Sequence, residues 1–207
     1  MLIERYLPCY DVTEVQEIQV DAPPEVTYKA IRRADLRDPL ISALFSLREL
    51  PDRLARKLSG ARARPAPKSF TFADMATPEM GFVLLAEHPL REFVVGSAGC
   101  FWKRDYGSRP LTATDFVGFR EPGYAKLVLG FSVLPTGLGG SVLRYEARTA
   151  TTDETARKRF LRYWRIIRPG VAIVMRRALQ RIKAEAERPV CQKVMPKWRL
   201  ALSRNLL

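Results

Sequence analysis

Residues 151–188 read TTDETARKRFLRYWRIIRPGVAIVMRRALQRIKAEAER, and this stretch says more about the architecture than any other part of the chain. Apolar side chains recur in it at intervals of three and four residues, which is typical of an amphipathic helix with one face on a core. The apolar positions are Ala156, Phe160, Tyr163, Trp164, Ile167, Val171, Val174, Ala178 and Ile182. We therefore predict one long helix over this stretch.

Two local signals bear on how that helix begins and bends. Thr151 and Glu154 have the spacing of a capping box, in which each side chain satisfies a backbone N–H group at the helix start. Pro169-Gly170 interrupts the middle, because proline removes one backbone hydrogen bond. The apolar stripe continues beyond it in nearly the same phase. One kinked helix is therefore favoured over two separate helices.

The N-terminal third predicts a strand followed by helices. Residues 14–20 alternate apolar and polar side chains, which favours a strand. Pro24 then suits the first turn of a helix that continues to about residue 35. Apolar spacing predicts further helix over 36–58, and the Pro-containing segment 61–69 reads as a linker.

The middle of the chain changes to short runs with β character, separated by Pro and Gly. The six predicted strands are residues 70–75, 81–87, 91–99, 112–119, 124–134 and 142–150. The whole pattern predicts an α+β fold in the order β-α-α-β6-α, with a curved antiparallel sheet of about seven strands around the long C-terminal helix. We expect one domain over residues 12–188, an N-terminal extension over 1–11 and a basic tail over 189–207.

Four segments resemble those of the Bet v 1/START-like superfamily, also called SRPBCC or polyketide cyclase/dehydrase and lipid transport-like. They are VDAPPEVTYKAI (20–31), REFVVG (91–96), EPGYAKL (121–127) and FLRYWRIIRPG (160–170), and they look like those of an uncharacterised bacterial branch. The resemblance covers about residues 12–188. It implies a helix-grip fold, in which a cavity lies between the concave sheet and the long helix.

Members of this superfamily hold sterols, lipids, polyketides or plant hormones in that cavity. The resemblance thus implies binding or transport of a hydrophobic small molecule. The candidate cavity residues are Phe82, Phe93, Phe116, Phe131, Tyr145, Phe160, Tyr163, Trp164, Ile167 and Val171. An ordinary filled core is the alternative for the same side chains.

A polyketide cyclase-like enzyme is the second function considered. In it Tyr145, Glu146 or Arg148 would move protons for a substrate folded in the cavity. Strand alternation puts Leu143, Tyr145 and Ala147 on the more apolar face, so we expect Glu146 and Arg148 on the outer, solvated face. No catalytic residue is assigned.

The sequence lacks the residues that a hydrolase triad or a metal site requires. His88 is the single histidine and reads as a turn residue before Pro89. Ser97 and Ser132 therefore have no histidine for a hydrolase triad. The cysteines lack C-x-x-C spacing, so we predict reduced thiols, no metal site and no cofactor. They are Cys9, Cys100 and Cys191.

The net charge of +13 is concentrated near the C-terminus, with +7 over 152–188 and +4 over 189–207. The basic helix face is either a solubilising surface or a site for an anionic membrane. Apolar tail residues could join such a site: Trp198, Leu200, Leu202, Leu206 and Leu207. No stacking or base-reading motif is present, so no specific nucleic-acid partner is expected.

The charged start of the chain does not fit a signal peptide, with Glu4 and Arg5 in its first residues. No apolar run is long enough to suggest a membrane span. We therefore expect a cytoplasmic protein, and the sequence leaves its oligomeric state open.

Overall fold

A computed structural model of the chain describes residues 1–36, 71, 81–103, 106–137 and 139–188. In these residues one sheet has the strand order β1-β5-β4-β3-β2. Its strands are β1 (Val12–Val20), β2 (Val83–His88), β3 (Glu92–Gly99), β4 (Ala125–Pro135) and β5 (Ser141–Thr151). Every neighbouring pair is antiparallel, as predicted.

The predicted number of about seven strands is wrong for the described residues, which hold five. One predicted strand, 112–119, is instead the short helix α5 (Ala113–Gly118). Another, 70–75, lies outside the described residues except for Thr71. The predicted helices over 36–58 lie outside them after Leu36, and so does the linker 61–69.

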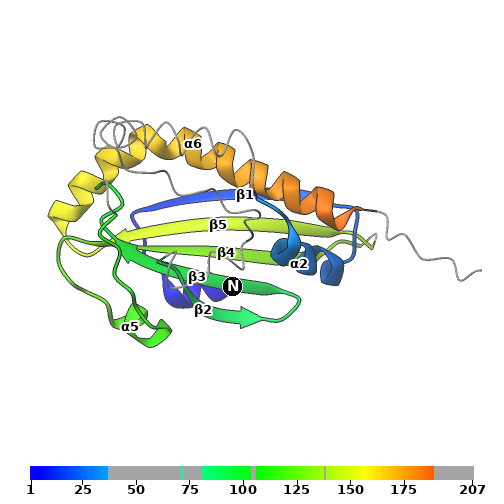
Figure 1. Ribbon diagram of the computed structural model, residues 1–207, viewed down its shortest axis with the longest axis horizontal. Helices are drawn as coiled ribbons and strands as arrows, with labels where there is room; N and C mark the ends of the chain where they lie inside the picture. The colour runs from blue at the N-terminus through cyan, green and yellow to red at the C-terminus, as the bar shows by residue number, and fades with distance from the viewer. Residues whose placement is uncertain (37–70, 72–80, 104–105, 138, 189–207) are drawn as a thin grey trace, which may run out of the picture.

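Helix α6 (Glu154–Ala186) is a single helix of 33 residues with Pro169 inside it, which confirms the long-helix prediction. It bends as it passes over the sheet along β1 (Figure 1). The predicted capping box is wrong. Asp153 is the N-cap and accepts a hydrogen bond from the Ala156 N–H at 2.8 Å, while Thr151 ends β5. Aspartate is as good an N-cap as threonine.

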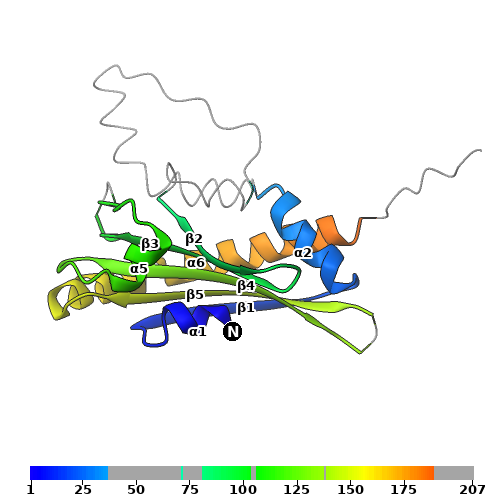
Figure 2. The ribbon, with the colours of Figure 1, turned by 90° about the horizontal axis from the view of Figure 1, so that it is seen from below.

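Helices cover both faces of the sheet. Helix α2 (Pro24–Arg33) and α6 lie on one face, which we call the α6 face, and share one hydrophobic cluster with it. Helix α1 (Leu2–Tyr6) and α5 lie on the other, the α1 face, with a second cluster. Figure 2 shows α1 against the side of the sheet opposite α2. Both faces are therefore at least partly buried.

The two short helices of the α1 face each sit over a glycine. A Cβ atom on Gly130 of β4 would lie 3.2 Å from Ile3 Cδ1 of α1. A Cβ atom on Gly96 of β3 would lie 2.9 Å from Phe116 Cε2 of α5. Glycine at these two positions allows the helices to approach the sheet closely.

None of the helices in the described residues combines the length and the apolar character needed to cross a lipid bilayer.

Candidate functional site

Three of the predicted cavity residues form a row across the α6 face. Phe93, Phe131 and Tyr145 are direct cross-strand neighbours on β3, β4 and β5. The ring centroids of Phe93 and Phe131 lie 5.3 Å apart, and those of Phe131 and Tyr145 lie 4.1 Å apart. Tyr28 of α2 meets the Phe93 ring edge-on at 6.2 Å. All four are buried in one cluster, so this row is packed core.

A second aromatic group lies at the N-terminal half of α6. The ring centroid of Phe160, which is buried, lies 6.1 Å from that of Trp164 and 6.4 Å from that of Tyr163. Trp102, in the loop that follows β3, completes the group at 6.3 Å from Phe160. Figure 1 shows this loop rising toward α6. We call these four residues the Trp102 cluster. All except Phe160 are only half-buried.

The Trp102 cluster contains an unsatisfied hydrogen-bond donor. The indole Nε1 of Trp102 is buried and has no acceptor, and no other buried side-chain nitrogen or oxygen of the described residues shares this state. Leaving such a donor unpaired costs about 1–3 kcal/mol. Because an indole N–H can only donate, it needs an acceptor atom from water or from a ligand. Apolar rings around one directional polar group are typical of small-molecule sites.

The remaining predicted residues of the α6 side are less enclosed. Phe82 and Val171 are partly buried and pack against the hydrophobic cluster of the α6 face. Ile167 lies half-buried on α6, one turn before Val171. Along α6, Ile167 and Val171 lie between Trp164 of the Trp102 cluster and Met175 of the packed core.

Phe116 does not lie on the α6 face. It is fully buried in the cluster of the α1 face. The reason is local, because residues 113–118 form a helix and not a strand. The hydroxyl of Thr112 accepts a hydrogen bond from the Asp115 N–H at 3.1 Å, and the Asp115 carboxylate accepts one from the Thr112 N–H at 3.3 Å. This capping box was the sequence signal for the helix.

Glu146 and Arg148 form a buried ion pair on the α1 face. Arg148 Nε donates to Glu146 Oε1 at 2.7 Å, and Arg144 Nη2 donates to Glu146 Oε2 at 2.9 Å. Strand alternation correctly puts both residues away from α6, but the expected solvation is wrong. They are 4% and 6% exposed. Residues 1–11 cover them, and the Leu7 carbonyl accepts a hydrogen bond from Arg148 Nη1 at 3.2 Å.

The charges of this pair are mutually satisfied. Burial raises the pKa of Glu146, but hydrogen bonds from Arg148 and Arg144 outweigh burial and hold the pKa below its ordinary value. Glu146 therefore stays ionised and is not a proton donor near neutral pH. Of the three groups considered for a cyclase, only Tyr145 faces α6, and burial raises the pKa of its hydroxyl.

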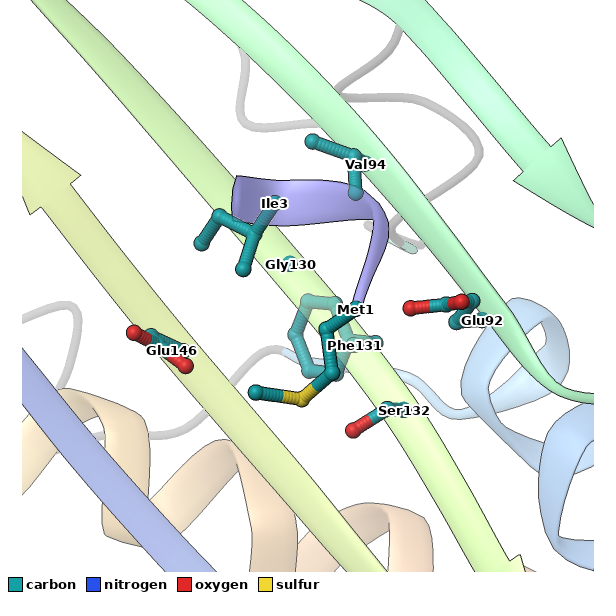
Figure 3. A pocket seen from close by; sticks show the side chains of 8 residues that line it. All are labelled: Met1, Ile3, Glu92, Val94, Gly130, Phe131, Ser132 and Glu146. Carbon is teal, nitrogen blue, oxygen red and sulfur yellow. The ribbon is translucent and has the colours of Figure 1, made fainter. Parts of the chain in front are cut away.

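A small pocket lies beneath α1 on the α1 face (Figure 3). Its lining residues are Met1, Ile3, Glu92, Val94, Gly130, Phe131, Ser132 and Glu146. Its free volume is ≈ 10 Å³, which is room for about one water molecule. Sites for drug-sized ligands have roughly 300–1,000 Å³. This pocket is therefore too small for a lipid or a polyketide.

Lys126 is a buried amine that the sequence did not single out. Its Nζ donates to the Val117 carbonyl at 3.3 Å and lies 4.7 Å from the centroid of the Phe116 ring. Burial, with a smaller contribution from the charge of Arg120, lowers the pKa of Lys126 to about 8. A buried lysine with a lowered pKa is one of the features that mark candidate functional sites. Here the amine sits against α5, on the opposite face from the Trp102 cluster.

In the described ranges, no group of three or more His, Cys, Asp and Glu side chains could hold a metal ion. Cys9 is an exposed free thiol and Cys100 a buried one, while Cys191 lies outside those ranges. His88 is the last residue of β2 and precedes the turn to β3.

Trp102 is the site residue that sequence reasoning missed. The segment CFWK over 100–103 follows a strand and holds two adjacent aromatic residues in a loop. Side chains in a connecting loop do not repeat at a helical or strand period. The spacing of apolar residues therefore does not predict which way Trp102 points. Large apolar side chains in a loop were the available signal.

Comparisons with known proteins identify no family for this chain. No family model matches it, and no curated protein matches it. Several solved structures match over most of its length at low sequence identity.

One is protein MLL2253 from Mesorhizobium loti, at 14% identity and a TM-score of 0.39, covering 86% of this chain and 98% of that one. A protein from Nitrosospira multiformis matches at 15% identity and a TM-score of 0.36, covering 84% of this chain and 95% of that one. CalU16 from Micromonospora echinospora matches at 15% identity and a TM-score of 0.27, covering 84% and 85%. With TM-scores below 0.5, these likenesses carry no argument about function.

Proposed function

We propose that this protein binds a hydrophobic small molecule, such as a lipid, a sterol or a polyketide-like compound, between the N-terminal half of α6 and the sheet. The observation that supports this most strongly is the buried, unpaired indole N–H of Trp102 among aromatic rings. A ligand with an apolar body and one carbonyl, carboxylate or hydroxyl oxygen matches both features.

The arrangement of α6 also supports this site. Toward its C-terminus α6 buries Met175, Leu179 and Ile182 against the core, whereas Tyr163 and Trp164 remain half-buried. The C-terminal half of α6 therefore anchors the helix to the core, while the N-terminal half keeps aromatic surface that is accessible to a ligand. A ligand could cover this surface without unpacking the core.

An enzyme of the cyclase type has less support. Glu146 and Arg148 are paired with each other on the α1 face, on the far side of the sheet from the proposed ligand. The proposal therefore needs no proton transfer and assigns Trp102 a binding role.

Replacing Trp102 with phenylalanine tests the proposal, because it removes the N–H group and keeps an aromatic ring. We expect the free protein to gain about 1 kcal/mol of unfolding free energy, since a buried unpaired donor is lost. We expect affinity for a bound probe to fall about tenfold, since the ligand acceptor loses its partner. The probes are a fluorescent fatty acid, cis-parinaric acid, and a fluorescent sterol, dehydroergosterol, titrated by fluorescence.

Trp164→Phe is the matched control. It makes the same change in the same cluster, but Trp164 is not among the described residues that hold a buried unpaired donor. This variant should not gain stability and should weaken probe binding by no more than about threefold. The proposal fails if neither probe binds the wild-type protein, or if both variants change affinity equally.

A further inference from the structure

The outer face of α6 carries a band of cations that pair with no carboxylate of the described residues. Its six residues are Lys158, Arg159, Arg162, Arg165, Arg176 and Arg177, all exposed. In the part of the chain that the structure describes, none of them forms an ion pair. Other cations of α6 do, since Arg157 lies 2.8 Å from Asp11 and Arg168 lies 3.3 Å from Glu14.

The unpaired cations share one side of the helix. At 100° per residue they fall within an arc of about 120°, opposite the buried stripe that includes Phe160 and Ile182. We call this side the cationic face. By the same count the paired residues Arg157 and Arg168 point about 120–140° away from the centre of the cationic face, toward the side of α6 that meets the sheet. The carboxylates of Asp11, just before β1, and Glu14, in β1, therefore neutralise the side of α6 that meets the sheet. The outer side of the helix remains positive.

Two large apolar side chains lie within the cationic face. Ile166 is 78% exposed and Ile173 is 41% exposed. They lie at either side of Pro169, which is inside α6. A bent helix that curves around a core turns its convex side outward. The two exposed isoleucines lie on this outward side of α6, with cations before and after them along the helix.

We infer that the cationic face of α6 docks on an anionic lipid membrane, with Ile166 and Ile173 inserted among the headgroups. This interaction is separate from the proposed ligand site, which lies on the opposite side of the same helix. Six unpaired cations attract anionic headgroups, and exposed aliphatic side chains gain from leaving water at the interface. A nucleic acid would use the cations but would leave the isoleucines in water, and the face has no aromatic residue on which bases could stack.

The test is sedimentation of the full chain with vesicles of phosphatidylcholine alone or with 30% phosphatidylserine. We expect binding only to the anionic vesicles, and we expect it to weaken at least tenfold as salt rises from about 0.05 to 0.5 M. The same chain is mixed with a 30-nucleotide single strand and a 30-base-pair duplex. Equal binding to both kinds of vesicle, or tighter binding to nucleic acid than to anionic vesicles, overturns the inference.

Matched variants locate the interaction on α6. Arg162→Gln with Arg176→Gln should weaken vesicle binding about 25-fold, because each cation near an anionic surface contributes roughly fivefold. Arg157→Gln with Arg168→Gln removes the same charge from the sheet side of α6, where both arginines are paired, and should change binding by less than about threefold. Equal losses in the two double variants would show that net charge alone is responsible and would overturn the assignment to this face.

The apolar contribution has its own pair of variants. Ile166→Ser with Ile173→Ser should weaken binding about tenfold at every salt concentration, since aliphatic insertion is not screened by ions. Val117→Ser with Leu134→Ser removes exposed apolar side chains of α5 and β4, which are 50% and 55% exposed, and should leave binding unchanged. An isoleucine variant that binds as tightly as the wild type contradicts insertion.

Discussion

Replacing Glu146 with alanine is expected to lower the free energy of unfolding by about 3–5 kcal/mol. The substitution leaves the guanidinium of Arg148 buried without its Glu146 partner, while Arg144 keeps only its half-exposed partner Glu17. An uncompensated charge in a protein interior costs far more than the ion pair itself contributes. The measurement is urea denaturation at pH 7 followed by circular dichroism.

Glu17→Ala is the control for this prediction. Glu17 also pairs with Arg144, at 2.6 Å, but its side chain is 49% exposed. Solvent replaces an exposed partner, so we expect a loss of no more than about 1 kcal/mol. If both substitutions cost the same, residues 1–11 do not bury the Glu146–Arg148 pair, and the description of the α1 face is wrong.

The double replacement Glu146→Leu with Arg148→Met separates the charge from the packing. It removes both ions and keeps side chains of similar length, so we expect it to recover most of the stability lost in Glu146→Ala. A double variant as unstable as the single one would mean that the pair, and not the isolated charge, supplies the stability.

Replacing Ile182 with alanine is expected to cost about 2–5 kcal/mol of unfolding free energy, the usual range for truncating a buried isoleucine. Ile182 is fully buried in the cluster that α2, α6 and the sheet share. The loss combines the transfer of apolar atoms with the cavity that remains. Urea denaturation of the variant gives the value directly.

Ile166→Ala makes the same change on the same helix at a position that is 78% exposed. It should change stability by less than about 0.5 kcal/mol. The contrast between these two isoleucines tests which side of α6 faces the core. A similar loss in both variants would mean that the orientation of the helix is wrong.

The parts of the fold with a clear period were predictable from sequence. The long helix and the strands 91–99, 124–134 and 142–150 agree with α6, β3, β4 and β5 within a few residues. In each, burial on one face imposes a regular spacing of apolar side chains. Alternation along β5 also predicted which face carries Glu146.

Short helices were not predictable in the same way, and neither was the burial of a strand by a segment far away in the sequence. The run over 112–119 has β-like residues, but the reciprocal hydrogen bonds of Thr112 and Asp115 start a helix there. Residues 1–11 are too few to show a period, yet Leu2 and Ile3 are buried on the sheet. Helix α1 covers the sheet face on which Glu146 lies. The sequence therefore predicted the direction of the Glu146 side chain but not its burial.

The candidate site shows the same limit. The sequence predicts Phe160, Tyr163 and Trp164 as candidates because they lie on the helical stripe. It does not predict Trp102, whose contact with Phe160 joins a loop to a helix 58 positions later. Only the three-dimensional arrangement reveals that a buried indole N–H lies unpaired in this cluster.

Native mass spectrometry of the purified full chain, followed by organic extraction of whatever is bound, tests the ligand-binding proposal most directly. The proposal predicts one hydrophobic molecule per chain, carrying at least one oxygen or nitrogen acceptor, and a lower occupancy in Trp102→Phe than in Trp164→Phe. A chain that is empty as purified, and that stays empty after incubation with fatty acids, sterols and aromatic polyketides, would contradict it.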